Sequence, residues 1–133
     1  MKFKVEIEGI ASSAFSEVSG IDADVSVVDY RPGNDKAPGP RKLPGEAHFS
    51  NIVLKRGMTS DLSLWEWMQK TLDGKVERKN GSVVLLDEAG TEKIRWNFSE
   101  AWPSKWTGPA FNSTGNNVAI ETLEITHEEI SRV

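Results

Sequence analysis

Short segments in which apolar and polar residues alternate recur along the whole sequence, and this period of two is the feature that most constrains the fold. Successive side chains of a β-strand point to opposite faces, so each such segment is typical of a strand with one buried face. The alternation is clearest from Phe3 to Ile7 and from Ile94 to Phe98. All such segments together give about seven strands separated by turn residues. The chain is therefore expected to be mainly β.

One segment has the period of a helix instead. Residues 59–61 supply short oxygen side chains that can cap a helix start, and the segment from Leu62 to Leu72 follows them. Its apolar residues recur at steps of three and four: Leu64, Trp65, Met68 and Leu72. This stripe should pack on a sheet. The predicted fold is an antiparallel β-sandwich or barrel with one packed helix at about residues 61–72, in a single domain of residues 1–133.

Residues 31–45 interrupt the strand pattern. They contain four prolines and three glycines, a density that disfavours both a helix and a paired strand. The sequence therefore predicts a long loop, and a loop of this length is usually either functional or disordered. It is interpreted as a flexible insertion or as an arm that orders against a neighbouring copy. The candidate contact residues of such an arm are Arg31, Asn34, Lys36, Pro38, Arg41 and Lys42.

Three other segments carry specific expectations. A strand from Phe49 to Leu54 should stop at the charged residues Lys55 and Arg56 and at Gly57. Two prolines exclude residues 101–109 from a central strand position and favour an edge or a crossover between sheets. Between Val118 and Thr126 the apolar residues change faces, which predicts a bulge or burial on both sides. Gly81 is expected at a further bulge.

The sequence offers little apparatus for catalysis or for cofactor binding. It contains no cysteine, and its two histidines, His48 and His127, lack the spacing of metal ligands. No glycine-rich phosphate loop or nucleophile elbow is present. A net charge of -4 disfavours nucleic acid as the main partner, and no apolar run reaches the ~18 residues of a membrane span. We expect a non-enzymatic protein with no metal and no cofactor, made in the cytoplasm.

Five tryptophans are many for a chain of 133 residues. Such rings either fill a core or anchor interfaces. Trp65 and Trp67 lie on nearly opposite sides of the predicted helix, so one of them should face solvent or another protein. Trp65 and Trp96 are interpreted as core residues, and the candidate interface aromatics are Trp67, Trp102 and Trp106.

Six short motifs occur in order along the chain: Phe15–Gly20, Tyr30–Asn34, Arg41–Gly45, Leu54–Gly57, Leu64–Trp67 and Ala101–Pro103. Together they resemble the tail tube protein family of contractile phages and phage-like contractile injection systems. The resemblance implies a subunit that forms hexameric rings, in which strands join edge to edge into a continuous inner β-barrel. The rings stack into a hollow rigid tube, which a contracting sheath drives through a target envelope.

The resemblance also implies partners and a location. The partners are further copies of the chain, a contractile sheath protein, baseplate or spike and tube-terminator proteins, and protein cargo in the lumen. No nucleic-acid specificity and no stable membrane anchoring are implied. Such a subunit is made in the bacterial cytoplasm and becomes part of a phage tail, or of a phage-tail-like particle that can be released.

Two surfaces acquire expected roles from this resemblance. The exposed side of the helix, with Glu66, Gln69 and Asp73, is expected to face the sheath. The polar face of the strands should line the lumen, with Lys4, Glu6, Arg95 and Asn97 as examples. Two alternatives remain open: an adaptor or initiator ring beside the spike or baseplate, and a monomeric β-barrel that carries a small apolar ligand.

Overall fold

The computed structural model describes residues 1–11, 14–33, 39–115 and 118–133. Within these ranges the elements are β1 (Lys2–Ile7), β2 (Glu17–Ser19), β3 (Ala23–Tyr30), β4 (Arg41–Phe49), β5 (Ile52–Gly57), α1 (Ser63–Leu72), β6 (Lys79–Leu86), β7 (Glu92–Thr107), β8 (Ile120–Thr126) and β9 (Glu129–Arg132). All strand pairs are antiparallel. The mainly β fold with one helix is as predicted.

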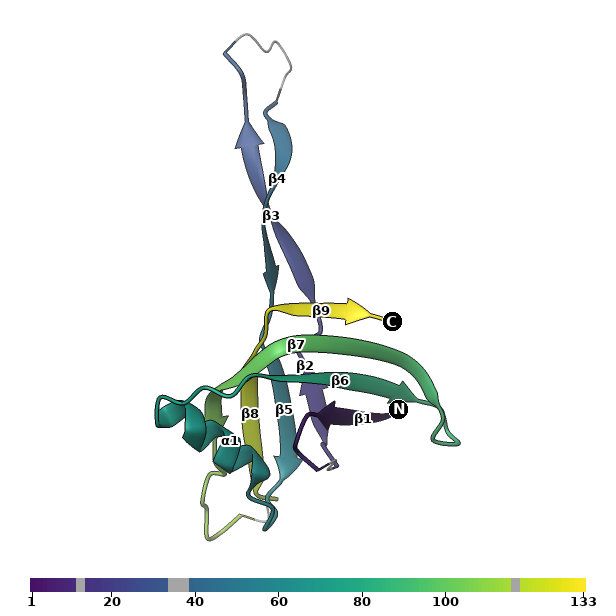
Figure 1. The fold of residues 1–133 in the computed structure, drawn as a ribbon, viewed down its shortest axis with the longest axis vertical. Coiled ribbons are helices and arrows are strands. Elements are labelled where there is room, and N and C mark those ends of the chain that lie inside the picture. The colour runs from purple at the N-terminus through teal and green to yellow at the C-terminus, as the bar shows by residue number, and fades with distance from the viewer. Residues whose placement is uncertain (12–13, 34–38, 116–117) are drawn as a thin grey trace.

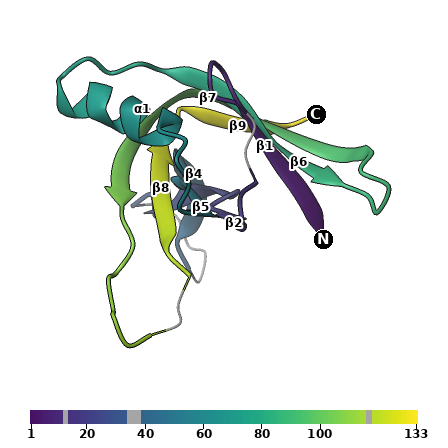
Figure 2. The same ribbon diagram turned by 90° about the horizontal axis from the view of Figure 1, so that it is seen from below.

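The strands form two half-sheets that share β7. The path runs β1-β6-β7-β8-β5-β2, and β9 also pairs with β7. The first half-sheet is β1, β6, the first part of β7, and β9; the second is the end of β7 with β8, β5 and β2. The change of partner falls between Ala101, which pairs with β6, and Trp102, which pairs with β8. Figures 1 and 2 show β7 curving from one half-sheet into the other. Both predicted alternatives for residues 101–109, an edge and a crossover, apply: β7 changes half-sheet at residues 101–102, and among the described residues its end pairs with β8 alone.

The core fills the space between the half-sheets and α1. Its buried members are Val5, Ile7, Ile52, Leu54, Leu64, Trp67, Val83, Phe98, Ala101, Leu123 and Ile125. Gly81 allows the backbone of β6 to lie close to β1 and to the Phe98 ring, because a Cβ at this position would lie 2.4 Å from both the Glu6 carbonyl oxygen and the Phe98 ring. The register shifts between Lys79 and Gly81, so the predicted bulge is confirmed.

The helix buries a different stripe from the predicted one. Leu64, Trp67 and Met68 face the core, whereas Leu72 is 62% exposed. Trp67 can be buried because its indole N–H donates to the carbonyl oxygen of Glu77 at 2.7 Å. Trp65 is half-buried and does not belong to the buried core. The predicted stripe was therefore wrong for Leu72 and omitted Trp67.

The strand predicted for residues 49–54 is also corrected. β4 ends at Phe49, and β5 runs from Ile52 to Gly57 through the charged residues that were expected to stop it. Arg56 is tolerated there because its Nε donates to Glu121 Oε1 of β8 at 2.5 Å. Glu121 therefore occupies a core-facing position in β8, in phase with Leu123 and Ile125. The apparent change of face in this strand reflects a buried carboxylate, and β8 pairs with β5 without a register shift.

The last five residues of the predicted loop, 41–45, belong to a β-hairpin in the structure. β3 and β4 pair as a separate two-stranded sheet, with Pro44 opposite Val27 and Gly45 beside a register shift. A two-stranded ribbon leaves the outer edge of each strand unpaired, where a proline is tolerated. The loop prediction was thus wrong for residues 41–45. The candidate residues Asn34, Lys36 and Pro38 lie outside the described residues.

Candidate assembly surfaces

The β3–β4 hairpin, called the arm from here on, projects from the body of the protein (Figure 1). All of β3 is exposed, and β4 is exposed up to Phe49. Five large apolar side chains on the arm are between 43% and 67% exposed: Val25, Val27, Val28, Tyr30 and Leu43. A two-stranded ribbon without a core is marginally stable in water, and clustered exposed apolar side chains mark interaction surfaces. The arm therefore has the properties of a segment that a partner covers.

Charge is unevenly distributed along the arm. Lys42 donates to Asp29 on the opposite strand at 2.7 Å, and Arg31 and Arg41 are exposed at the same end. Near the body, His48 lies 3.2 Å from Asp24. The structure thus places the predicted residues Arg31, Arg41 and Lys42 together, at the end of the arm distant from the body.

The first half-sheet has two unpaired edges. Within the described residues β1 pairs only with β6, apart from an isolated bridge between Ile7 and Ile10, and β9 pairs only with β7. Unpaired edges expose backbone N–H and C=O groups that can pair with another chain. The two edges lie on opposite sides of the same half-sheet, so one copy can offer β1 to the β9 of the next.

One face of this half-sheet is polar. The register of β1, β6 and β7 places Lys4, Glu6, Arg95 and Asn97 on this face, opposite the core. Arg95 lies 3.3 Å from Glu6 and 2.6 Å from Glu92, and Lys4 lies 3.2 Å from Glu6. Arg95 donates hydrogen bonds to Glu6 and to Glu92, and these two bonds are the main cause of the lowered pKa of each glutamate. The same two bonds raise the pKa of Arg95. A lattice of ion pairs thus covers part of the polar face.

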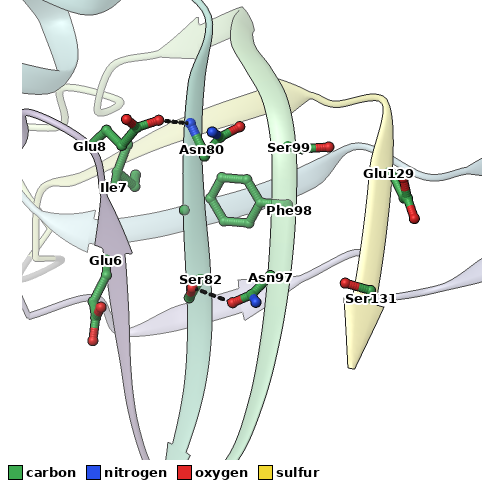
Figure 3. A pocket seen from close by; sticks show the side chains of 11 residues that line it. Glu6, Ile7, Glu8, Asn80, Ser82, Asn97, Phe98, Ser99, Glu129 and Ser131 are labelled. Atoms are coloured by element: carbon green, nitrogen blue, oxygen red, sulfur yellow. Dashed lines mark hydrogen bonds between the residues drawn. The ribbon is translucent and has the colours of Figure 1, made fainter. Parts of the chain in front are cut away.

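Beside this lattice the polar face forms a groove of about 640 Å³ (Figure 3). It is lined by Glu6, Ile7, Glu8, Asn80, Gly81, Ser82, Asn97, Phe98, Ser99, Glu129 and Ser131. The Ser82 hydroxyl donates to Asn97 Oδ1 at 2.6 Å, and Glu8 accepts the Asn80 backbone N–H. The lining of the groove is mostly polar and carries both carboxylates and serine hydroxyls.

The outward side of α1 is polar. The predicted residues Glu66, Gln69 and Asp73 are all exposed. Lys70 on the same helix forms an ion pair with Glu77 in the segment that follows. At the start of the helix Asp61 accepts the backbone N–H of Ser63 at 3.0 Å and its hydroxyl at 2.9 Å, and these bonds are the main cause that lowers the pKa of Asp61.

The candidate interface aromatics lie in different environments. Trp67 is only 2% exposed, so its prediction as an interface residue was wrong. Trp102 and Trp106 are half-buried. The Trp106 ring meets that of Trp65 edge to face, with 4.9 Å between ring centroids, and both line a groove of about 350 Å³ near the start of α1. The sequence predicted that Trp65 and Trp67 would differ in exposure, but it assigned Trp65 to the core and Trp67 to the interface, whereas Trp67 is buried and Trp65 is half-buried.

The described residues contain no group of three or more His, Cys, Asp or Glu side chains that could hold a metal ion. In the same part of the chain, no helix has the length and apolar character needed to cross a membrane.

The fold and its surfaces define a class of protein: a small antiparallel β subunit with unpaired sheet edges, a polar sheet face and a protruding ribbon that lacks its own core. The chain belongs to a family within this class, described as the T4-like virus tail tube protein gp19 family, which it matches over residues 1–131. No curated protein matches the chain.

Solved structures resemble the chain over nearly its whole length. A chain of the PVC sheath–tube complex in the extended state, from an extracellular contractile injection system, is 28% identical with a TM-score of 0.87, covering 99% of this chain and 88% of that one. A chain of the anti-feeding prophage tube-terminating cap is 28% identical with a TM-score of 0.86, covering 98% and 87%. Hcp1 from Flavobacterium johnsoniae shares the fold at 22% identity, with a TM-score of 0.65 and coverage of 98% and 93%.

Proposed function

We propose that the chain is the repeating subunit of the hollow inner tube of a contractile injection particle or contractile phage tail. Its family membership over residues 1–131 and its likeness to a chain of a sheath–tube complex carry this proposal. The proposed role is structural and includes no catalytic step. The partners are further copies of the chain, a sheath protein, and the baseplate and terminator proteins that complete such particles. Assembly takes place in the bacterial cytoplasm before the particle is released.

The two unpaired edges of the first half-sheet support ring formation. When β1 of one copy pairs with β9 of the next, each contact uses two different surfaces, and a constant rotation between copies closes a ring. A closed ring leaves neither of these two edges exposed. The anti-feeding prophage baseplate, in which a chain shares this fold, was solved with six-fold symmetry, and we propose six copies for this chain.

The two faces of the first half-sheet support the orientation of the subunit in the ring. The core and α1 lie on the apolar face, so the polar face with Lys4, Glu6, Arg95 and Asn97 points the other way. Closure with the polar face inward gives a hydrophilic lumen wall, suited to the passage of a hydrated protein cargo. In this orientation α1 lies outside, and Glu66, Gln69 and Asp73 face the sheath.

The arm supports contact with a neighbouring copy in the stack. Its exposed apolar side chains and its basic end at Arg31, Arg41 and Lys42 are suited to a partner surface of mixed character. Axial contacts of this kind do not close, so they extend rings into a tube. We propose that the arm makes this contact.

Disulfide trapping tests the proposed ring contact, because the chain has no cysteine of its own. A panel of variants would combine one cysteine on β1, such as Lys4→Cys, with one on β9, such as Ser131→Cys. Mild oxidation is expected to give a ladder of covalent oligomers that ends at the hexamer on a non-reducing gel. A matched control pairs Gln69→Cys with Lys75→Cys, which lie away from both edges. Only monomers across the whole β1–β9 panel would contradict the ring contact, and hexamers that never stack would favour the adaptor-ring alternative.

A further inference from the structure

The direction of the arm depends on its two connections to the body. The strands β3 and β4 pair with each other and with no other strand among the described residues. One connection is residues 20–22, between β2 and β3, and the other is residues 50–51, between β4 and β5. The arm leaves the body beside the turn that joins β8 to β9 (Figure 1).

His127 lies in that turn and is 8% exposed. Its ring is flanked by Phe49 at the end of β4, with 5.9 Å between centroids, and by Phe98 of β7 at 6.4 Å. Its Nε2 lies 2.9 Å from the backbone oxygen of Ser50. A backbone carbonyl can only accept, so Nε2 carries the proton and donates it. His127 therefore holds the end of the arm by one hydrogen bond and by ring contacts.

Asn51, the next residue after Ser50, is fixed at both ends of its side-chain amide. Its Nδ2 donates to Glu124 Oε1 at 3.0 Å, and its Oδ1 accepts the Thr126 hydroxyl at 3.1 Å. Both partners are on β8. The connection between β2 and β3 lies against Asn51 as well, because a Cβ on Gly20 would lie 2.0 Å from the Asn51 carbonyl oxygen. Both ends of the arm therefore meet at a single hydrogen-bonded site.

We propose that His127 and Asn51 form a clamp, here called the shoulder clamp, that sets the direction in which the arm leaves the body. They act as positioning residues for the contact between copies, so the inference rests on the proposed role of the arm in stacking. An arm that swings freely loses conformational entropy each time it docks, whereas a clamped arm is already oriented for binding. The clamp lies entirely within one chain, so it aims the arm before any partner arrives.

The direction of the arm can be measured in unassembled subunits by double electron–electron resonance. Spin labels at Val28→Cys on the arm and Gln69→Cys on α1 report one intramolecular distance, and the chain has no native cysteine to interfere. His127→Phe keeps an aromatic ring but removes the donor to Ser50, whereas His127→Gln keeps an N–H donor at a similar position. Loss of the donor removes the hydrogen bond to the Ser50 carbonyl, so the clamped orientation should fall roughly tenfold relative to all others, equivalent to about 1.4 kcal/mol.

We expect a narrow distance distribution in the labelled parent and in His127→Gln, and a broad one in His127→Phe. Thr126→Val, which removes the hydroxyl donated to Asn51, should broaden it independently and serves if His127→Phe does not fold. Glu128→Gln, a change at an exposed neighbouring residue, is the matched control and should leave it narrow. A narrow distribution in both His127→Phe and Thr126→Val would overturn the clamp.

Tube formation by the same variants separates the clamp from the role of the arm. We expect His127→Phe to form fewer tubes than His127→Gln under electron microscopy. A broadened distance distribution in a variant that still forms tubes as well as the parent would overturn the role of the clamp in assembly. If a variant that lacks the arm also formed normal tubes, the proposed stacking role of the arm would fall as well, while the distance measurement would still decide the clamp itself.

Discussion

The ion pair between Arg56 and Glu121 provides the sharpest prediction about stability. The two residues face each other in the register of β5 and β8, and their side chains are 2% and 4% exposed. Arg56 Nη1 also lies 3.3 Å from Asp61 beside the helix start, and the guanidinium lies 5.9 Å from the centre of the Phe15 ring. The pair therefore connects the second half-sheet to α1 inside the core.

Removing one partner leaves the other charge buried without its main counter-ion, at a cost of roughly 3–5 kcal/mol. Arg56→Met should cost more than Glu121→Met, because Asp61 still offers a carboxylate to Arg56 when Glu121 is gone. The double variant Arg56→Met/Glu121→Met buries no charge at this site and should lose less than either single variant. A domain is typically stable by ~5–15 kcal/mol, so a single change removes a large share of the total.

Urea unfolding of the unassembled subunit, at one fixed protein concentration, measures these differences through the midpoint when the slope is unchanged. Lys55→Met is the matched control, because the neighbouring Lys55 pairs with Glu17 at the surface at 3.6 Å and such pairs contribute ~0–1 kcal/mol. A stabilising role of the buried ion pair is ruled out if Arg56→Met loses no more stability than Lys55→Met, or if the losses of the two single variants simply add in the double variant.

Three further predictions concern the core, the polar face and the arm. Gly81→Ala should destabilise the subunit by ~1–3 kcal/mol through its clash with Phe98 and the Glu6 carbonyl, whereas Gly57→Ala, with open space at its Cβ, should cost less in the same urea assay. The pKa of Glu6 is lower in the folded state, so its ion pair with Arg95 adds stability above pH ~4.5, and this stability is lost as the pH falls through the folded-state pKa. The difference in unfolding free energy between the parent and Glu6→Gln should therefore shrink on acidification. A difference that grows on acidification would contradict this prediction. Val27→Ser together with Tyr30→Ser should change the unfolding free energy of the subunit by less than ~0.5 kcal/mol but reduce stacking in sedimentation, and unchanged stacking would contradict the role of the arm.

Period-two alternation predicted the strands whose apolar face meets the core of the same chain. In β1 and in the first part of β7 the expected faces are the observed ones. β9 was not predicted, since its four residues include a single apolar side chain, Ile130. Its position depends on pairing with β7, which is a long-range property that local sequence does not encode.

Two errors at charged and aromatic residues have the same origin. Arg56 and Glu121 break the apolar pattern of β5 and β8, and only their juxtaposition across the sheet makes both acceptable in the core. Trp67 is buried in place of Leu72 because the carbonyl of Glu77 is available to its N–H. In both cases a partner outside the element itself decided the outcome.

In the arm the sequence pattern predicts burial that the single chain does not provide. Residues 23–30 alternate like a half-buried strand, yet every side chain of β3 is exposed in the single chain. The pattern is explained if the missing burial is supplied by another copy. The candidate surfaces on the arm and the helix could therefore be named from the sequence, whereas the shoulder clamp at the root of the arm could not.

Electron microscopy of the purified protein shows whether this chain assembles with itself. Six-membered rings and hollow rods built from stacked rings are expected, with β1 of one copy next to β9 of its neighbour in the resolved map. A folded protein that stays monomeric at high concentration, with neither rings nor rods under any condition of salt or pH, would contradict this expectation.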